Sequence, residues 1–218
     1  MNLLVGVDPC DYGDVLQYLK EHELHLGEGQ RMRHKMKQWK RKWLKSNIKV
    51  HRTAVIDDGA QIGEGTTIWH YAHVCTGATI GRDCSIGQCT FIDDGVIVGD
   101  RCHIGNCVNV WKGITLEDDV NLRPMCILTN DRMPTRKSNF VPGKTLIQRG
   151  ASIGAGAIIV CGESGGNARV IGVSSIIGAG AVIVKNVASG MVVCGMPQCR
   201  SEWPVDTCGT FIDGVMQP

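Results

Sequence analysis

The chain is poor in aromatic side chains, with 5 Trp, 3 Tyr and 3 Phe among 218 residues, whereas it has 28 glycines. Aromatic residues supply much of the volume of a conventional layered core, and glycine weakens the interior of helices and strands, so such a core is not expected. The glycines lack a period of three, which excludes collagen. No apolar run approaches the roughly 18 residues of a membrane helix, and residues 1–6 are too short for the core of a signal peptide. We therefore expect a repeat protein that does not associate with a membrane.

An excess of charge of one sign is also absent, because 23 Lys and Arg are balanced by 21 Asp and Glu. This balance does not describe a wholly basic nucleic-acid-binding protein. The 11 cysteines come without a secretory signal, so we expect reduced thiols rather than a disulfide framework. These features predict a cytoplasmic protein.

The strongest pattern is a branched aliphatic residue at every sixth position. It holds without a miss over Val50, Ile56, Ile62, Ile68, Val74, Ile80, Ile86, Ile92, Val98, Ile104, Val110, Leu116, Leu122 and Leu128. Neither a helix of 3.6 residues per turn nor an alternating strand has this period. Hexapeptide repeats are typical of a parallel β-helix, in which three six-residue units form one coil of about 18 residues. The predicted fold is therefore mainly β, with the aliphatic residues stacked along the inside.

The repeat is broken twice. After Leu128, the segment 129–146 is rich in proline and charge, which predicts an excursion from the coil. The phase returns at Ile147, Ile153 and Ile159, breaks again over a predicted surface loop at 163–168, and ends with Ile171, Ile177 and Ile183. A long loop in a regular solenoid is usually functional, because the scaffold does not need it.

Residues 18 apart stack in such a coil, so His70, Gln88 and Asn106 should form a ladder. Polar side chains of this kind are costly to bury, and the ladder should therefore face solvent or a cleft between subunits. We interpret it as a substrate-binding surface, with solvated corner side chains as the alternative. By the same spacing, Cys84 lies over Cys102 as compact apolar packing.

Histidine is absent from the excursion, because the seven histidines lie at positions 22, 25, 34, 51, 70, 73 and 103. An acyltransferase that acts on a hydroxyl generally needs a histidine base, and His70 or His73 would have to supply it. A zinc centre of the carbonic-anhydrase kind would need three converging histidines, and the spacing of His70, His73 and His103 does not bring them together simply. We therefore expect no metal.

Three stretches are more specific than the repeat: residues 67–74 (TIWHYAHV), 110–119 (VWKGITLEDD) and 128–134 (LTNDRMP). Together with residues 150–156 (GASIGAG) and 159–162 (IVCG), they resemble the sugar-nucleotide 3-amino N-acetyltransferases. That family has a left-handed β-helix fold and acetylates the C3 amine of UDP- or dTDP-linked amino sugars. The resemblance covers about residues 50–200 and implies the same fold and activity here.

The resemblance also implies the acceptor residues. It places Asn130 at the acceptor amine and gives Asp131 the role of orienting the sugar or receiving a proton late in the reaction; an Asx turn is the alternative for this pair. A neutral amine is already nucleophilic, so it needs alignment with the thioester more than it needs a histidine base. Arg132 and Arg136 are expected at the nucleotide diphosphate, because the guanidinium fork suits phosphate.

The co-substrate implied by the resemblance is acetyl-CoA, bound in a groove between neighbouring subunits of a homotrimer. Its pantetheine would follow two small-residue coil edges, and two basic residues would lie near its phosphates. The edges are Gly154, Ala155, Gly156, Gly178 and Ala179, and the basic residues are Lys185 and Arg200.

Residues 1–49 do not keep the six-residue period and carry 10 basic and 6 acidic side chains. Within them, segment 30–49 has nine basic residues and no acid, with Met32, Met36, Trp39 and Trp43 at helical spacing. We predict a basic amphipathic helix that caps the open end of the coil, with a nucleic-acid or anionic-surface contact as the alternative. The predicted organisation is a small, partly α-helical appendage over 1–49, a left-handed parallel β-helix domain over 50–200 and a tail over 201–218.

The sequence thus predicts an acetyl-CoA-dependent N-acetyltransferase acting on a nucleotide sugar. Two alternatives stay open. One is an O-acetyltransferase of the same fold with His70 or His73 as base. The other is a non-catalytic β-helix that serves as a binding module.

Overall fold

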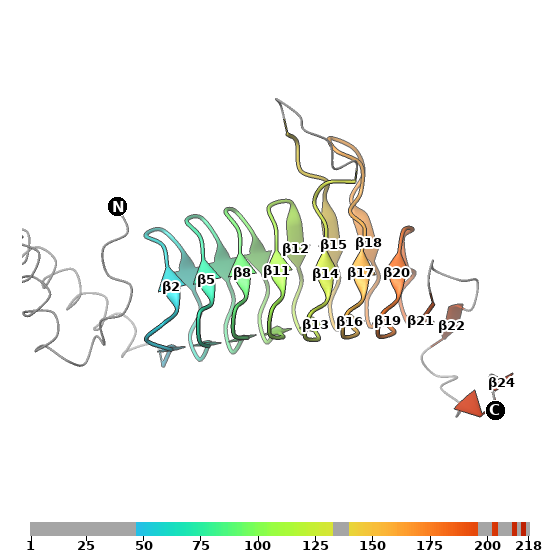
Figure 1. Cartoon of the computed structure of the whole chain (residues 1–218), viewed down its shortest axis with the longest axis horizontal. Coiled ribbons are helices and arrows are strands. Elements are labelled where there is room, and N and C mark those ends of the chain that lie inside the picture. Colours follow the sequence, from blue (N-terminus) through green and yellow to red (C-terminus); the bar gives the residue numbers. More distant parts are fainter. Residues whose placement is uncertain (1–46, 133–139, 196–201, 205–210, 213–214, 217–218) are drawn as a thin grey trace, which may run out of the picture.

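The computed structural model describes residues 47–132, 140–195, 202–204, 211–212 and 215–216. In this part of the chain the backbone forms short strands and no helix. The strands stack in parallel at one strand per hexapeptide, so the predicted left-handed parallel β-helix is confirmed. Figure 1 shows the coils lying side by side along the long axis of the molecule.

Three faces run along the coil. Face one consists of β1 (Lys49–Val50), β4 (Thr67–Ile68), β7 (Ser85–Ile86), β10 (His103–Ile104), β13 (Asn121–Leu122), β16 (Ser152–Ile153), β19 (Ile176–Ile177) and β21 (Met191–Val193). Face two consists of β2 (Val55–Ile56), β5 (His73–Val74), β8 (Phe91–Ile92), β11 (Asn109–Val110), β14 (Ile127–Leu128), β17 (Ile158–Ile159) and β20 (Val182–Ile183). Face three consists of β3 (Gln61–Ile62), β6 (Thr79–Ile80), β9 (Ile97–Val98), β12 (Ile114–Leu116), β15 (Thr145–Ile147) and β18 (Arg169–Ile171).

The aliphatic residues of the repeat form the core, as the period predicts. Ile86 pairs in register with Ile104, which pairs with Leu122, and each of the three side chains is fully buried. Cys84 and Cys102 are also buried, and each thiol donates to a carbonyl of the next coil, to Gly99 O and Glu117 O at 3.1 Å. The prediction that these cysteines act as packing residues is confirmed.

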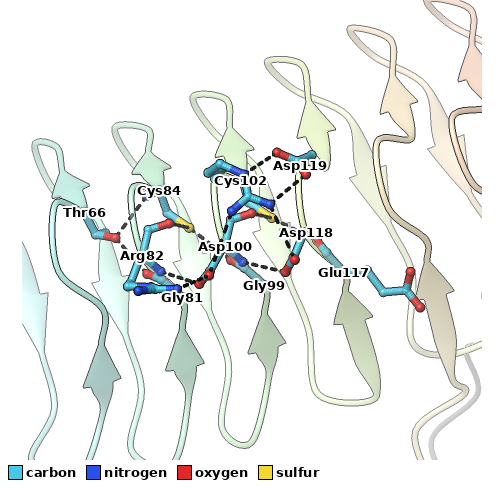
Figure 2. Close-up of polar contacts among 11 residues, drawn as sticks. Thr66, Gly81, Arg82, Cys84, Gly99, Asp100, Cys102, Glu117, Asp118 and Asp119 are labelled. Atoms are coloured by element: carbon cyan, nitrogen blue, oxygen red, sulfur yellow. Dashed lines mark hydrogen bonds and ion pairs between the residues drawn. The ribbon is translucent and has the colours of Figure 1, made fainter.

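Charged side chains form hydrogen bonds between neighbouring coils at the corner between faces three and one (Figure 2). Asp100 Oδ1 accepts from the backbone N–H of Arg82 at 2.8 Å, and Asp118 Oδ1 accepts from the N–H of Asp100 at 2.9 Å. Arg101 Nε donates to Asp119 Oδ1 at 2.7 Å. The backbone N–H groups of Arg82 and Asp100 are thus each satisfied by a carboxylate from the following coil.

Some boundaries differ from the prediction. Lys49, assigned to the basic helix, lies in β1 and pairs with Thr67. The excursion ends at position 144 rather than 146, because β15 begins at Thr145. The coil also continues past Ile183, since Val187 bridges to Ile171 and β21 adds a further strand to face one.

At the C-terminal end, β22 (Glu202–Pro204) pairs with β21 in antiparallel fashion, and β23 (Phe211–Ile212) pairs with β24 (Val215–Met216). The predicted tail thus contains strands. The predicted helices of the appendage, including its basic segment at positions 30–46, lie outside the described residues.

Candidate functional site

Both insertions leave the coil at the same corner, between faces two and three. Residues 129–144 follow β14, and residues 160–168 follow β17 on the next coil. Figure 1 shows the described parts of the two segments, residues 129–132 with 140–144 and residues 160–168, on one side of the helix. They are joined by an antiparallel bridge between Gly143 and Ser164, and Gly162 N–H donates to Lys144 O at 3.0 Å. We call this place the loop corner.

Asn130 and Asp131 lie at the base of the excursion, and both are half-buried. The backbone closes on itself here, because Gly143 N–H donates to Asn130 O at 2.7 Å. The preceding side chain, Thr129, accepts through Oγ1 from Cys161 N–H at 3.0 Å. These bonds fix the backbone of Asn130 on the rigid coil rather than on the tip of a loop.

An arginine that the sequence analysis missed lies beside this corner. Arg169 is only 8% exposed, and its guanidinium donates to Val160 O at 2.9 Å, Cys161 O at 3.5 Å and Asn186 Oδ1 at 3.4 Å. Burial, followed by the neighbouring charge of Arg132, lowers the pKa of Arg169. The partners named here are all neutral, so the site favours an incoming anion. The signal in the sequence was an arginine two residues before Ile171, a position that holds a small or aliphatic residue elsewhere in the repeat.

A hollow of about 220 Å³ opens between the two insertions. Its lining includes Arg132, Arg169, Asn167 and Asn186. Arg132, predicted at a diphosphate, also pairs with Glu163 at 3.4 Å in an exposed ion pair. The lining of the hollow therefore includes two arginines and two asparagines together with one carboxylate, that of Glu163. The two guanidinium groups suit a phosphate or carboxylate group of a ligand that displaces Glu163 from Arg132.

The other predicted residues lie on a different corner, between faces one and two, which we call the ladder corner. His70, Gln88 and Asn106 follow β4, β7 and β10 by two residues, so the predicted ladder is confirmed in register. Asn106 Oδ1 accepts from the backbone N–H of Gln88 at 3.0 Å, and the ring of His70 stacks on His51 with centroids 3.5 Å apart. At least Asn106 therefore has a structural role, and its predicted role in substrate binding stays a prediction.

The small residues predicted to bind acetyl-CoA continue the same ladder corner. Ala155 and Ala179 follow β16 and β19 by two residues and are exposed, while Gly154 and Gly178 are half-buried. Ala179 has no acceptor side chain and cannot cap the N–H of Ala155 as Asn106 caps Gln88. This edge thus offers backbone donors without bulky side chains in front of them.

The remaining predicted residues are divided between the loop corner and the undescribed part of the chain. Lys185 follows β20 by two residues, so it shares the loop corner with Asn130 and is exposed. Arg136 and Arg200 lie outside the described residues. A single chain therefore places the predicted acceptor residues and the predicted acetyl-CoA edge on two different corners.

The histidines do not form the three-histidine centre considered from the sequence. His70 lies at the ladder corner, His73 on face two and His103 on face one. His73 instead contacts Asp57, with Nε2 and Oδ1 3.1 Å apart, and its Nε2 lies 3.9 Å from Cys75 Sγ. This grouping was not predicted from the sequence, although Asp57 and Cys75 are 18 residues apart and therefore stack.

In the part of the chain that the structure describes, no helix is long and apolar enough to cross a membrane.

Comparison with known proteins bears on the repeat and the fold. Residues 59–94 match the family profile described as "Bacterial transferase hexapeptide (six repeats)". No protein of curated function matches the sequence. Among solved structures, a point mutant of AntD, an N-acyltransferase from Bacillus cereus in complex with dTDP and coenzyme A, aligns with a TM-score of 0.50 and 20% identity. The alignment covers 74% of this chain and 86% of AntD.

A second similar structure is the acetyltransferase domain of PglB from Neisseria gonorrhoeae, with a TM-score of 0.46 and 21% identity. That alignment covers 76% of this chain and 65% of the PglB domain, so the chain spans less than two thirds of that domain. The same domain has been solved in complex with acetyl coenzyme A. Residues 59–94 thus match a hexapeptide-repeat profile, and the left-handed β-helix of this chain is similar in fold to AntD.

Proposed function

We propose that this protein transfers an acetyl group from acetyl-CoA to the amine, at C3, of a UDP- or dTDP-linked amino sugar. The observation that carries the proposal is the loop corner. Two insertions interrupt an otherwise regular scaffold on consecutive coils. They meet at the bridge between Gly143 and Ser164, and Gly143 also donates to the carbonyl of Asn130. A scaffold of this kind needs neither insertion, which supports a ligand site between them.

The chemistry of the proposed step requires alignment more than proton removal. The neutral amine attacks the thioester carbonyl carbon, and the tetrahedral oxyanion then collapses with loss of the coenzyme A thiolate. Asn130 accepts a hydrogen bond from the amine through its amide oxygen, which directs the lone pair at the acyl carbon. The ammonium proton leaves to the thiolate or to Asp131.

The hollow beside the loop corner supports recognition of an anionic substrate. Arg169 is buried against neutral partners, and Arg132 is exposed at the rim. A diphosphate or a sugar carboxylate would be held by both guanidinium groups. The ion pair of Arg132 with Glu163 would then open, which costs little because both side chains are exposed.

Because the predicted acetyl-CoA edge and the predicted acceptor residues lie on two separate corners, we infer that a complete site needs more than one chain. The acetyl-CoA edge at Ala155 and Ala179 and the acceptor residues at Asn130 lie on different corners of the same β-helix. We propose a homotrimer in which the ladder corner of one subunit faces the loop corner of its neighbour. Closed cyclic symmetry then repeats the same site three times.

The O-acetyltransferase alternative rests on His70 or His73 as base. His70 stacks on His51 at the ladder corner, and His73 contacts Asp57 in the N-terminal coils, several coils away from Asn130. Neither arrangement favours a base at the loop corner. The proposed amine acceptor needs none.

The test compares three variants in a thiol-release assay with acetyl-CoA and a 3-amino sugar nucleotide. Asn130→Ala should lower kcat/KM by about 100-fold or more, since alignment of the nucleophile is lost. His70→Ala and His73→Ala should stay within about 10-fold of the unmodified protein, well below the contribution of a general base. The reverse ranking, with a histidine variant inactive and Asn130→Ala active, would establish the O-acetyltransferase alternative. Absence of acetyl-CoA binding by calorimetry would favour the non-catalytic module.

A further inference from the structure

A cluster of metal-ligand side chains lies on the first two coils, apart from the loop corner. His73 Nε2 is 3.1 Å from Asp57 Oδ1 and 3.9 Å from Cys75 Sγ. The three ligand atoms all lie within 4.8 Å of one another, and the three residues are half-buried. The cluster is thus compact and reachable from solvent.

The register of face two explains why these residues meet. Asp57 directly follows β2 and Cys75 directly follows β5, so the parallel pairing of these strands stacks the two residues. His73 begins β5 and points away from the core, whose space at this level is filled by Val74. The repeat therefore holds three different ligand types on one rigid surface.

The charges around Cys75 favour a cation. Asp57 belongs to the cluster itself, and Asp93 and Asp94 follow β8 on the next coil, where β8 pairs with β5. The nearby ammonium group of Lys112 is held by Asp94 at 2.7 Å. Three carboxylates against one lysine leave this surface with two negative charges in excess, which a divalent cation would neutralise.

The geometry suits zinc. Tetrahedral zinc with bonds of about 2.0–2.3 Å places its ligand atoms about 3.3–3.8 Å apart, close to the separations of His73 from its two partners. We propose that Asp57, His73 and Cys75 bind a Zn²⁺ ion, with Cys75 releasing its proton on binding. Nitrogen, sulfur and oxygen together select zinc over magnesium or calcium, which prefer oxygen ligands.

The fourth position is open to solvent. Asp93, the next residue in the same stacked row, already accepts through Oδ1 from Asp94 N–H at 2.8 Å and through Oδ2 from Lys112 N–H at 3.0 Å. Its carboxylate is therefore engaged. A water molecule completes the coordination, as in zinc sites that keep an exchangeable position.

This site is separate from the proposed acyl-transfer site. Thr129, at the base of the excursion, occupies the same stacked row three coils beyond Cys75, or about 14 Å along the axis at the usual strand spacing. Metal binding can accordingly be measured without any transferase assay. Failure of either proposal leaves the other standing.

The experiment titrates Co²⁺ into the full-length, reduced and chelator-treated protein and records its absorption spectrum. We expect one Co²⁺ per chain with a sulfur-to-cobalt charge-transfer band and the visible bands of four-coordinate cobalt, both of which Zn²⁺ displaces. Cys75→Ser should abolish the charge-transfer band, and His73→Gln and Asp57→Asn should weaken Co²⁺ binding by about 100-fold or more, since even outer partners of zinc ligands contribute 10–100-fold.

Cys107→Ser is the matched control, because Cys107 is an exposed cysteine at another corner and should leave the spectrum unchanged. The proposal is overturned if no charge-transfer band appears, or if the band survives in Cys75→Ser. It is equally overturned if His73→Gln and Asp57→Asn bind Co²⁺ as tightly as the unmodified chain. Circular dichroism of each variant verifies that the β-helix is retained.

Discussion

At the scale of single residues, each position of the hexapeptide has its own physical role. The inward aliphatic residue supplies buried apolar area, and the residue two positions later supplies a corner side chain that reaches the neighbouring coil. Asp100 and Asp118 show the second role, since each carboxylate accepts from a backbone N–H of the preceding coil. Stability therefore depends on ionised corner carboxylates as well as on the apolar stack.

The corner carboxylates predict an acid-sensitive fold. The hydrogen bond from Arg101 lowers the pKa of Asp119 below its ordinary value of 3.8, and the N–H of Arg82 lowers that of Asp100. A lowered folded-state pKa stabilises the protein above the unfolded-state value, and this contribution is lost as the pH falls below about 4. We expect the urea midpoint of unfolding to be flat down to about pH 5 and then to decline.

The control for this prediction is a pair of substitutions. Asp119→Asn should lower the urea midpoint at neutral pH and flatten its decline in acid, whereas Glu64→Gln, at an exposed corner, should change neither. The same acid profile in Asp119→Asn and in the unmodified protein would show that this carboxylate contributes nothing.

At the scale of elements, the two insertions behave as one structure. Two contacts join the excursion to the second loop: the bridge from Gly143 to Ser164 and the ion pair of Arg132 with Glu163. A third contact joins the coil to that loop, through the buried guanidinium of Arg169. Arg169 donates to two carbonyls of the second loop, which would otherwise lack these partners. The loop is therefore held by a residue of β18 rather than by its own turn chemistry.

Arg169→Met tests this role. Loss of the guanidinium leaves buried carbonyls without donors, which should cost about 1–3 kcal/mol of unfolding free energy. Amide hydrogen exchange should accelerate in residues 160–168, while the strands of residues 97–104 keep their protection. Arg123→Met is the matched control, because Arg123 is exposed at a corner, and it should leave both quantities unchanged. Equal exchange of the loop in both variants would contradict the role of Arg169.

The sequence predicted the elements well because the period of six determines which side chains face inward. From Val50 to Leu128 every predicted inward position is an inward strand position, and both breaks were found. The end of the first break was predicted two residues too late, since Thr145 can continue a loop or begin a strand. The period does not indicate which charged side chains are buried, so the burial of Arg169 was not predicted. The cluster of Asp57, His73 and Cys75 was missed because the stacking of residues 18 apart was not applied to a mixed set of carboxylate, imidazole and thiol ligands.

At the scale of the whole molecule, the coil arithmetic separates the proposed site into two halves. Asn106 and Asn130 are 24 residues apart, which is one coil plus one corner. The ladder corner and the loop corner of one chain therefore lie on opposite sides of face two. A complete site in the proposed trimer takes one corner from each of two subunits.

Complementation between two inactive variants tests this division. Asn130→Ala removes the proposed acceptor residue of the loop corner. Ala179→Trp places a bulky side chain on the exposed acetyl-CoA edge without disturbing the core. Trimers refolded from an equal mixture should recover about a quarter of the unmodified activity, because random assembly joins two intact corners at about one interface in four. A mixture as inactive as either variant alone would mean that each site lies within one chain.

The most direct test of the central claim is coenzyme A release from acetyl-CoA by the unmodified protein. The acceptors would be UDP- and dTDP-linked sugars that carry an amine at C3, an amine at C4, or a hydroxyl at C3. The account predicts turnover with a 3-amino sugar nucleotide and none with its 3-hydroxy counterpart. Turnover with the hydroxyl acceptor alone, or no turnover with any amine, would contradict it.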